Sequence, residues 1–418
     1  MSTEATRNGG LPVVIIGAGV VGLCLAHGLA NAGIPFEVYE RDESAISRDQ
    51  GWAITLHWCL PFLRALVTPQ ALVDAVEHTQ VDPAVGANDT GNFLFLNLAT
   101  LDVKFRIPPN HRRRVNRERF RQMLLRDERV SSRIRWGKKL FNLAMLDDGN
   151  VRATFDDGSE TMSQIVVGAE GTKSRTREFV APETHHNHPL AVKLLGTAVT
   201  MTPDQVQPLR AIDPLLFQGC HPETKSFLWV SALDTPATNG SEGTPDEHYR
   251  MQLIVSWPIL TEQDDPPLES DAERAEEMKR RAAGFHPTLL SAIQAVPSDG
   301  THSVQDVKIQ DWPCLPWDNH GGAVTLVGDA AHAMTMYRGE AANHGIMDAY
   351  HLVHALKQIY SEGRDKGEVI DSYEAEMRGR TSVAVEWSRE ACLGAHDYDG
   401  LNERSAVLRR RAVKLPEA

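Results

Sequence analysis

Short apolar runs alternate with helical segments at the start of the chain. Residues 13–16 form an unbroken Val-Val-Ile-Ile run, as expected for a parallel strand with both faces covered. A helical segment follows, Gly33 marks its end, and 36–40 have the pattern of a second strand. Strand, helix and strand in this order predict the first unit of a doubly wound α/β domain.

The middle of the chain has a different pattern. Apolar side chains occupy every second position from 251 to 257, and 226–233 is another strand-like run. The polar segment 234–248 between them contains Asn-Gly, which is a turn signal. We therefore predict an antiparallel sheet over roughly 190–260, inserted into the nucleotide-binding unit.

Helices and one further strand complete the chain. Ser270 and Glu273 have the spacing of a capping box at the start of a helix, and Gly284 is the expected stop. Residues 324–327 form an apolar strand that returns to the first unit. From 340 to 418 the sequence is mostly helical in pattern and charged.

Composition narrows the class of protein. The chain has 418 residues, of which 42% are hydrophobic and 24% charged, so it can bury a sizeable core. Its net charge of −13 argues against a protein that binds nucleic acid or anionic membranes, because both need a positive surface. Glycines interrupt the longest early apolar stretch, 13–30, so we expect neither a signal peptide nor a membrane span.

Cysteines and histidines give no sign of a metal site. The five cysteines are scattered without a Cys-x-x-Cys pair, which argues against disulfides or zinc and favours a cytoplasmic location. His185, His186 and His188 cluster after Pro182, but no carboxylate pattern on a helix accompanies them. We interpret this cluster as a solvated loop and expect no bound metal.

The first strand is followed directly by a glycine turn. Residues 17–22 spell Gly-Ala-Gly-Val-Val-Gly, where Gly17 allows the tight turn, Gly19 lets a pyrophosphate approach, and Gly22 lets helix and strand pack closely. Glu40 ends the second strand, where an acid would bind ribose hydroxyls. The turn predicts one bound dinucleotide without distinguishing FAD from NAD. The alternative is a turn that serves the backbone alone.

Two later segments also place a glycine turn after an apolar strand. Residues 166–171 spell Val-Val-Gly-Ala-Glu-Gly and continue to Ser174 and Arg177, while 326–332 spell Leu-Val-Gly-Asp-Ala-Ala-His. Both segments resemble motifs of the aromatic-ring hydroxylase family of single-component FAD-dependent monooxygenases, which includes para-hydroxybenzoate and salicylate hydroxylases. The spelling is most similar to that of fungal members that tailor secondary metabolites.

The resemblance implies which residues contact FAD. Gly328 and Asp329 are expected at the cofactor, with Asp329 bonded to its ribityl chain. The helix that begins near Ala341, Ala342 and Asn343 is expected to aim its N-terminus at the flavin ring. The positive end of a helix dipole there would stabilise the anionic reduced ring.

Three positions depart from the family pattern. Glu170 stands where the family has Asp, Met336 where it usually has Pro, and Ala341 where it has a second Gly. We expect altered local geometry at these positions. His332, at the end of its motif, is interpreted as structural rather than as a catalytic base.

Residues 51–58 lie where the family's chain passes the flavin. By that resemblance Ala53 is expected near the cofactor.

Ten arginines lie between 112 and 135. Arg117 is the candidate cofactor contact, because its surroundings resemble the family's arginine-bearing helix. The other arginines are interpreted as a solvated helix face, with attraction of the 2′-phosphate of NADPH as the alternative. Arg41, directly after Glu40, is expected at the adenosine end.

The resemblance also implies the reaction. NADPH or NADH binds transiently and reduces the flavin, O2 forms a hydroperoxyflavin, and one oxygen atom is transferred to the substrate as a hydroxyl or an epoxide. The candidate catalytic residues, which the resemblance places near the ring, are His57, Tyr337 and Arg338. The expected substrate is a small aromatic or polycyclic natural product.

These patterns together predict an α/β protein with a doubly wound FAD-binding domain, an inserted antiparallel-sheet substrate domain and a helical C-terminal segment. The limits are 1–75, 105–184 and 301–365 for the FAD-binding domain, 76–104 and 185–300 for the substrate domain, and 366–418 for the C-terminal segment. We expect a monomer or weak dimer. The alternatives are a flavin oxidoreductase that inserts no oxygen and a non-redox binding protein with the flavin fold.

Overall fold

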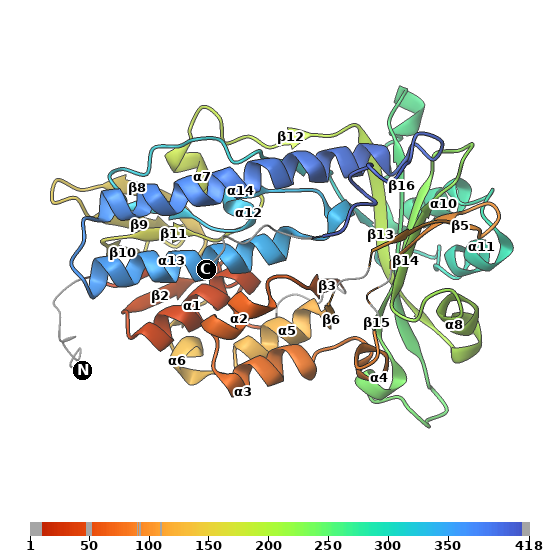
Figure 1. Ribbon diagram of the computed structural model, residues 1–418, viewed down its shortest axis with the longest axis horizontal. Coiled ribbons are helices and arrows are strands. Elements are labelled where there is room, and N and C mark those ends of the chain that lie inside the picture. The colour runs from red at the N-terminus through yellow and green to blue at the C-terminus, as the bar shows by residue number, and fades with distance from the viewer. Residues whose placement is uncertain (1–10, 47–51, 90, 92, 109–110, 412–418) are drawn as a thin grey trace.

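The chain folds into two halves that meet along one side (Figure 1). The computed structural model describes residues 11–46, 52–89, 91, 93–108 and 111–411. Gly51, in the segment expected beside the flavin, and the end of the expected C-terminal segment lie outside these ranges. No helix in the part of the chain so described is long and apolar enough to cross a lipid bilayer.

A parallel sheet of five strands forms the centre of the first half. Its order is β19-β11-β1-β2-β7, and every neighbouring pair is parallel. The chain thus adds strands on both sides of β1, which is the predicted doubly wound arrangement. The strands are β1 (Val13–Ile16), β2 (Phe36–Tyr39), β7 (Ile134–Arg135), β11 (Val166–Gly168) and β19 (Val324–Leu326).

Helices cover this sheet. α1 (Val20–Ala32) packs against α13 (Ala341–Tyr360), and α13 packs against α14 (Lys366–Gly394). In Figure 1, α14 runs alongside α13 and continues to the second half. The shorter helices of the first half are α2 (Leu60–Leu66), α3 (Pro69–Leu72), α5 (Arg117–Leu124), α6 (Glu128–Ser131), α7 (Arg175–Val180) and α12 (Asp329–His332).

Smaller sheets complete this half and connect it to the other. An antiparallel sheet, β10-β9-β8, forms between β7 and β11 in the chain, and β3 pairs with β6. A short pair, β12-β18, lies on the path between the halves. The bounds are β8 (Leu140–Met145), β9 (Val151–Phe155), β10 (Glu160–Ser163), β3 (Ala53–Leu56), β6 (Arg113–Asn116), β12 (His188–Pro189) and β18 (Gln310–Asp311).

The second half is built on a sheet of seven strands in the order β17-β13-β16-β15-β14-β4-β5. Neighbouring pairs are antiparallel, as predicted, except for the parallel pair β14-β4. The expected boundary at 104 lies within β5. The strands are β4 (Phe93–Asn97), β5 (Val103–Ile107), β13 (Val192–Met201), β14 (Leu216–Cys220), β15 (Phe227–Asp234), β16 (Tyr249–Pro258) and β17 (Gln305–Asp306).

Both faces of this sheet are covered, which the expected polar alternation along 251–257 did not indicate. On β16 the intervening Gln252 and Ile254 are as buried as Met251 and Leu253. Helices cover one face, and the other face turns toward the first half (Figure 1). Alternation along a strand cannot show whether the second face meets water or a neighbouring domain. The helices here are α4 (Pro83–Gly86), α8 (Pro203–Arg210), α9 (Pro236–Asn239), α10 (Asp271–Arg281) and α11 (Pro287–Gln294).

The predicted start of α10 is confirmed by its hydrogen bonds. Ser270 caps the backbone of Glu273, and the Glu273 side chain bonds back to the Ser270 N–H. The helix ends at Arg281, before Gly284. At Gly284 a Cβ would lie 2.8 Å from the His221 ring, so this glycine allows a close approach rather than ending the helix.

One buried carboxylate fastens α14 to the parallel sheet. Glu374 accepts hydrogen bonds from the Thr325 hydroxyl of β19 at 2.7 Å, from the Trp317 indole at 2.9 Å and from the Asn319 amide at 3.1 Å. These contacts hold the long C-terminal helix at the edge of the sheet beside the strand that precedes Asp329.

We expect Glu374→Ala to lower the free energy of unfolding by about 3 kcal/mol, because three buried donors lose their common acceptor. Urea unfolding followed by circular dichroism measures the loss. Glu390→Ala, at an exposed position of the same helix, is the matched control and should change stability by less than about 0.5 kcal/mol. Equal losses in the two variants would contradict the role of Glu374.

Candidate functional site

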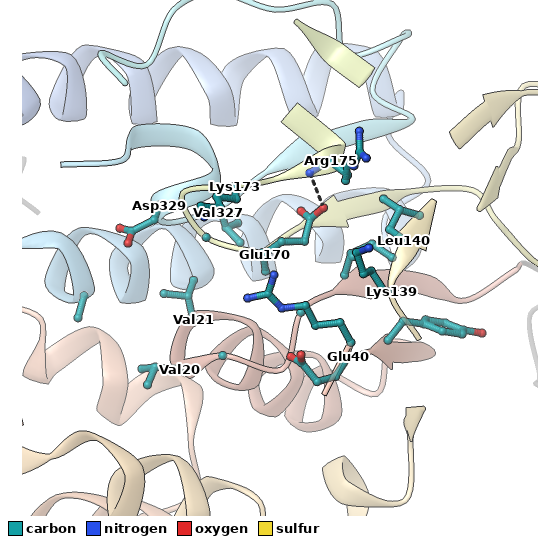
Figure 2. A pocket seen from close by; sticks show the side chains of 18 of the residues that line it. Val20, Val21, Glu40, Lys139, Leu140, Glu170, Lys173, Arg175, Val327 and Asp329 are labelled. Carbon is teal, nitrogen blue, oxygen red and sulfur yellow. Dashed lines mark hydrogen bonds between the residues drawn. The ribbon is translucent and has the colours of Figure 1, made fainter. Parts of the chain in front are cut away.

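The carboxyl ends of the parallel strands surround a cavity of about 480 Å³. In doubly wound sheets this edge is where ligands bind. Figure 2 shows Glu40 and Asp329 on opposite sides of the cavity, with Glu170 between them. The residues expected at the cofactor that line it are Gly17, Gly19, Glu40, Arg41, Arg117, Asp329, Ala341 and Ala342.

The glycine turn meets three different geometric demands. Gly17 has φ +111°, and a Cβ there would lie 2.6 Å from the Ala169 carbonyl oxygen. A Cβ on Gly22 would lie 2.0 Å from the Gly17 carbonyl oxygen, so α1 could not pack as closely. A Cβ on Gly19 would meet nothing within 4 Å. Gly19 therefore keeps open a stretch of cavity wall beside the free N–H groups that begin α1.

Glu40 closes the turn through the backbone. One of its carboxylate oxygens accepts a hydrogen bond from the Ala18 N–H at 2.7 Å, and the other accepts from the Asp42 N–H at 3.0 Å. The Arg121 side chain donates to the Ala18 carbonyl at 2.9 Å. Both peptide groups of Ala18 are thus fixed from side chains, which holds the turn in place before any ligand arrives.

The arginines between 112 and 135 were in part wrongly interpreted. Arg112, Arg114 and Arg121 are buried, with at most 7% of their surface exposed, rather than forming a solvated face. Each has internal partners: a carboxylate for Arg112, neutral hydroxyl and amide oxygens for Arg114, and backbone carbonyls for Arg121. A sequence pattern shows which side of a strand or helix a residue occupies and not what packs against that side.

Glu170 has a local structural role that accounts for its longer arm. Its carboxylate accepts hydrogen bonds from the N–H groups of Arg175 and Thr176, both at 3.0 Å, and from the hydroxyls of Ser174 and Thr176. Figure 2 shows the bond to Arg175. Burial raises the pKa of Glu170, against the effect of these bonds. The side chain thus anchors the start of α7 beside the cavity.

Asp329 differs from both other acids. Its carboxylate is half-buried, and no donor among the described residues bonds to it. Burial raises the pKa of Asp329, and the charges of His332, Arg117 and Arg177 act in the opposite direction. A carboxylate that faces a cavity without a partner fits a ligand that brings hydroxyl groups, as the ribityl chain of FAD does.

A second buried acid, Asp348 of α13, positions the turn that carries Asp329. It accepts from the Gly328 N–H at 2.9 Å, contacts His332 Nε2 at 2.5 Å and binds Arg380 of α14 at 2.7 Å. Burial alone would raise the pKa of Asp348, but the charges of His332 and Arg380 lower it below its usual value. His332 is thus tied into a buried ionic network, as its structural interpretation suggests.

A second cavity, of about 390 Å³, lies between the first cavity and the seven-stranded sheet. It shares Ile54, Asp329, Ala341 and Ala342 with the first cavity, so the two meet at the N-terminus of α13. Ala53 lines this second cavity rather than the first. Its remaining wall includes Trp52, Arg114, Leu194, Phe227, Trp229, Gln252, Ile254, Val307, Ile309, Met334, Met336 and Tyr337.

The three candidate catalytic residues line a smaller cavity of about 60 Å³ beside the second one. Tyr337, which also lines the second cavity, donates its hydroxyl to Ser256 at 2.8 Å. Arg338 pairs with Glu340 at 2.6 Å. Burial, with the charges of nearby arginines, lowers the pKa of His57 to about 3, so its ring is neutral at physiological pH. The ring's Nδ1 has no partner among the described residues.

Three expected cofactor residues line neither the first nor the second cavity. Gly22 packs against Gly17, and Gly328 has φ +61° and faces Val21. The Asn343 amide donates to the Thr55 carbonyl at 2.9 Å, and its oxygen accepts from the His57 N–H at 3.0 Å. These residues shape the wall from behind. The motif identifies them because close packing, like ligand contact, restricts residue type.

Several basic residues at the first cavity were not identified from the sequence. Lys138 and Lys139 follow β7, and Lys173 and Arg175 follow β11. Each pair comes just after the carboxyl end of a parallel strand, and that position was the signal that could have found them. Lys138, Lys139 and Arg175 form ion pairs with carboxylates of the chain, and Arg41 and Lys173 add positive charge at the cavity wall.

Comparisons with known proteins agree with this geometry. The sequence pattern of the FAD binding domain family matches residues 10–388. The chain is 42% identical over 385 residues to the FAD-dependent monooxygenase dbaB of Emericella nidulans, covering 91% of this chain and 95% of that protein. Two solved structures share the fold. For 2,6-dihydroxypyridine-3-hydroxylase of Arthrobacter nicotinovorans the TM-score is 0.75 at 15% identity, over 98% of both chains. For Klebsiella pneumoniae HpxO, complexed with FAD and uric acid, it is 0.72 at 18%, over 95% of this chain and 92% of that one.

Gly19→Val should give folded protein without flavin. The backbone at Gly19 has φ −74°, which valine tolerates, and the new side chain would project into the cavity where a pyrophosphate would lie. The flavin absorbance of purified protein measures the effect. Gly379→Val, at an exposed position of α14, is the matched control and should stay yellow. Normal flavin content in Gly19→Val would exclude this turn as the pyrophosphate site.

Asp329→Ala should fold normally and retain FAD weakly, because no protein group depends on the carboxylate and the expected ribityl contact is lost. A loss of about tenfold to a hundredfold in FAD affinity is expected for one charge-assisted hydrogen bond. Titration of the apoprotein with FAD, followed by flavin fluorescence, measures it. An unchanged dissociation constant would remove Asp329 from the cofactor site.

Proposed function

The chain belongs to the family of FAD-dependent monooxygenases, and we propose that it uses NADPH or NADH and O2 to hydroxylate or epoxidise a small aromatic or polycyclic molecule. The observation that carries the proposal is the junction of the two cavities at Asp329, Ala341 and Ala342. One cavity has the turn, acids and cations that suit a dinucleotide. The other is largely apolar, and residues of both halves line it.

The residues of the first cavity divide the cofactor between them in this proposal. The glycine turn and the start of α1 hold the pyrophosphate, with Arg41 and Arg117 adding positive charge. Glu40 lies at the adenosine ribose, and Asp329 binds the ribityl hydroxyls. When bound, FAD supplies the redox chemistry by accepting a hydride and activating O2. The chain itself orients the reactants and excludes water.

The N-terminus of α13 would act where the cavities meet. α13 has 20 residues, and its first two, Ala341 and Ala342, line both cavities. The N–H groups at a helix start are free to donate, and the helix dipole adds positive potential there. This end would stabilise negative charge that develops beside it during the reaction. His57, Tyr337 and Arg338 are proposed as residues that position the substrate from the adjoining small cavity.

The second cavity provides an aromatic binding surface. Phe227 and Trp229 of β15 and Ile254 of β16 face it from the seven-stranded sheet, and Trp52 closes it from the first half. Flat aromatic molecules stack on such walls and displace water from them. The five buried, unpaired cysteines suit a reducing compartment such as the cytoplasm, where NADPH and NADH are available.

Incubation with NADPH or NADH, ¹⁸O2 and a panel of aromatic and polycyclic compounds tests the proposal. We expect substrate-dependent NAD(P)H oxidation and a product that gains one ¹⁸O atom, with Gly19→Val protein as the inactive control. A product without ¹⁸O would indicate the alternative, a flavin oxidoreductase that inserts no oxygen. Absence of a flavin band after FAD addition would indicate the non-redox alternative.

A further inference from the structure

Arg114 is a buried cation in the wall of the second cavity. It lies on β6, between the glycine-turn half and the seven-stranded sheet, and 4% of its surface is exposed. Its side chain crosses to the sheet face that Phe227, Trp229 and Gln252 present to the cavity. The guanidinium carbon lies 5.5 Å from the centre of the Trp229 ring, within the range of cation–π attraction.

The hydrogen-bond partners of Arg114 are all neutral. Its Nη1 donates to the Thr55 hydroxyl at 2.9 Å, and Nη2 donates to the Ser231 hydroxyl at 2.8 Å and to the Gln252 amide oxygen at 3.5 Å. Its Nε has no partner among the described residues. No carboxylate of the described chain forms an ion pair with it. The five N–H groups of this guanidinium are therefore only partly used.

Two other buried arginines, Arg112 and Arg338, have counter-charges from the chain. Arg112 pairs with Asp89 at 2.7 Å, and Arg338 pairs with Glu340 at 2.6 Å. Both carboxylates come from the chain itself. The chain thus supplies counter-charges for Arg112 and Arg338, whereas no carboxylate among the described residues pairs with Arg114.

An uncompensated buried cation is costly, because water is removed and no opposite charge replaces it. Burial, together with the charge of Arg112, lowers the pKa of Arg114 to about 9, so the guanidinium stays protonated at neutral pH. Such a group is poised to gain from any anion that enters the cavity. The gain is large because the interaction takes place away from water.

We propose that Arg114 binds an ionised oxygen of the substrate, a phenolate or carboxylate on its aromatic ring, and so selects acidic aromatic compounds over their neutral analogues. The proposal rests on the proposed function only in taking the second cavity as the substrate site. In the proposed complex, the anion accepts hydrogen bonds from the guanidinium N–H groups that have no protein partner. The attached ring stacks beside Trp229.

Gln252 offers a test that does not remove the arginine. Gln252→Glu keeps the shape of the side chain and places a carboxylate where the amide oxygen now lies, 3.5 Å from Arg114 Nη2. This internal counter-charge should satisfy Arg114 and repel an incoming anion. If Arg114 were only a structural residue, the same variant would strengthen the fold without changing which ligands bind.

Isothermal titration calorimetry on the FAD-loaded protein, without NADPH or NADH, measures the selectivity. The probes are hydroxynaphthoates, which carry a carboxylate, and hydroxyanthraquinones that ionise near neutral pH, each paired with its methyl ester or methyl ether. We expect at least one acidic probe to bind about tenfold or more tightly than its neutral partner. A preference among the naphthoates assigns a carboxylate, and one among the anthraquinones assigns a phenolate.

Three variants locate the source of the preference. Arg114→Met and Gln252→Glu should each abolish it while leaving affinity for the neutral probes within about threefold. Lys308→Met removes an exposed cation from the same cavity wall and should keep the preference, because solvent screens that charge. If Arg114→Met fails to fold, Gln252→Glu decides.

Two results would overturn the proposal. One is the absence of any preference in the wild-type protein across the panel, including a failure of every probe to bind. The other is a preference that survives in Gln252→Glu or in folded Arg114→Met protein. The titration involves no turnover, so it tests the anion site independently of the reaction. A protein that prefers acidic probes but inserts no ¹⁸O would support the anion site and contradict only the proposed oxygenase function.

Discussion

The buried carboxylate of Asp348 organises the cofactor side of this molecule. It lies on α13, and the turn after β19, the helix α12 and the long helix α14 all send a donor or a positive charge to it. Removing it would leave Arg380 buried without its strongest partner and release the turn that carries Asp329. Two acids that lie close in the chain therefore differ: Asp348 has its partners within the protein, whereas no donor among the described residues bonds to the Asp329 carboxylate.

Both cavities are lined by some charged side chains that bond to other protein groups and by some that lack an opposite charge. Glu40 and Glu170 use their oxygens to fix backbone N–H groups, so each shapes the wall on which a ligand would rest. Arg112 and Arg338 have carboxylates of their own, and Arg114 has none. An unpaired buried charge destabilises a fold. A position where the protein keeps such a charge is therefore a candidate ligand contact.

Much of this arrangement could be predicted from the sequence, and the rest could not for identifiable reasons. The parallel sheet and the glycine turn were predictable because strand patterns and Gly17, Gly19 and Gly22 obey local rules. The burial of Gln252 and Arg114 was not, because it depends on which surface a distant part of the chain covers. Glu170 lay between these cases: the motif marked its position, and only the structure showed that its carboxylate reaches the start of α7.

The crossing of α14 from one core to the other has a consequence for how the protein is made. The last strand of the parallel sheet, β19, and the helices that fasten it all come from residues after 323, near the end of the chain. During synthesis the growing polypeptide has β1, β2, β7 and β11 but lacks the edge strand and Asp329. The nucleotide-binding half therefore cannot complete its parallel sheet until the segments of the seven-stranded sheet have been synthesised, although domains usually fold in the order in which they emerge. Completion of the first half thus depends on residues made after the second half.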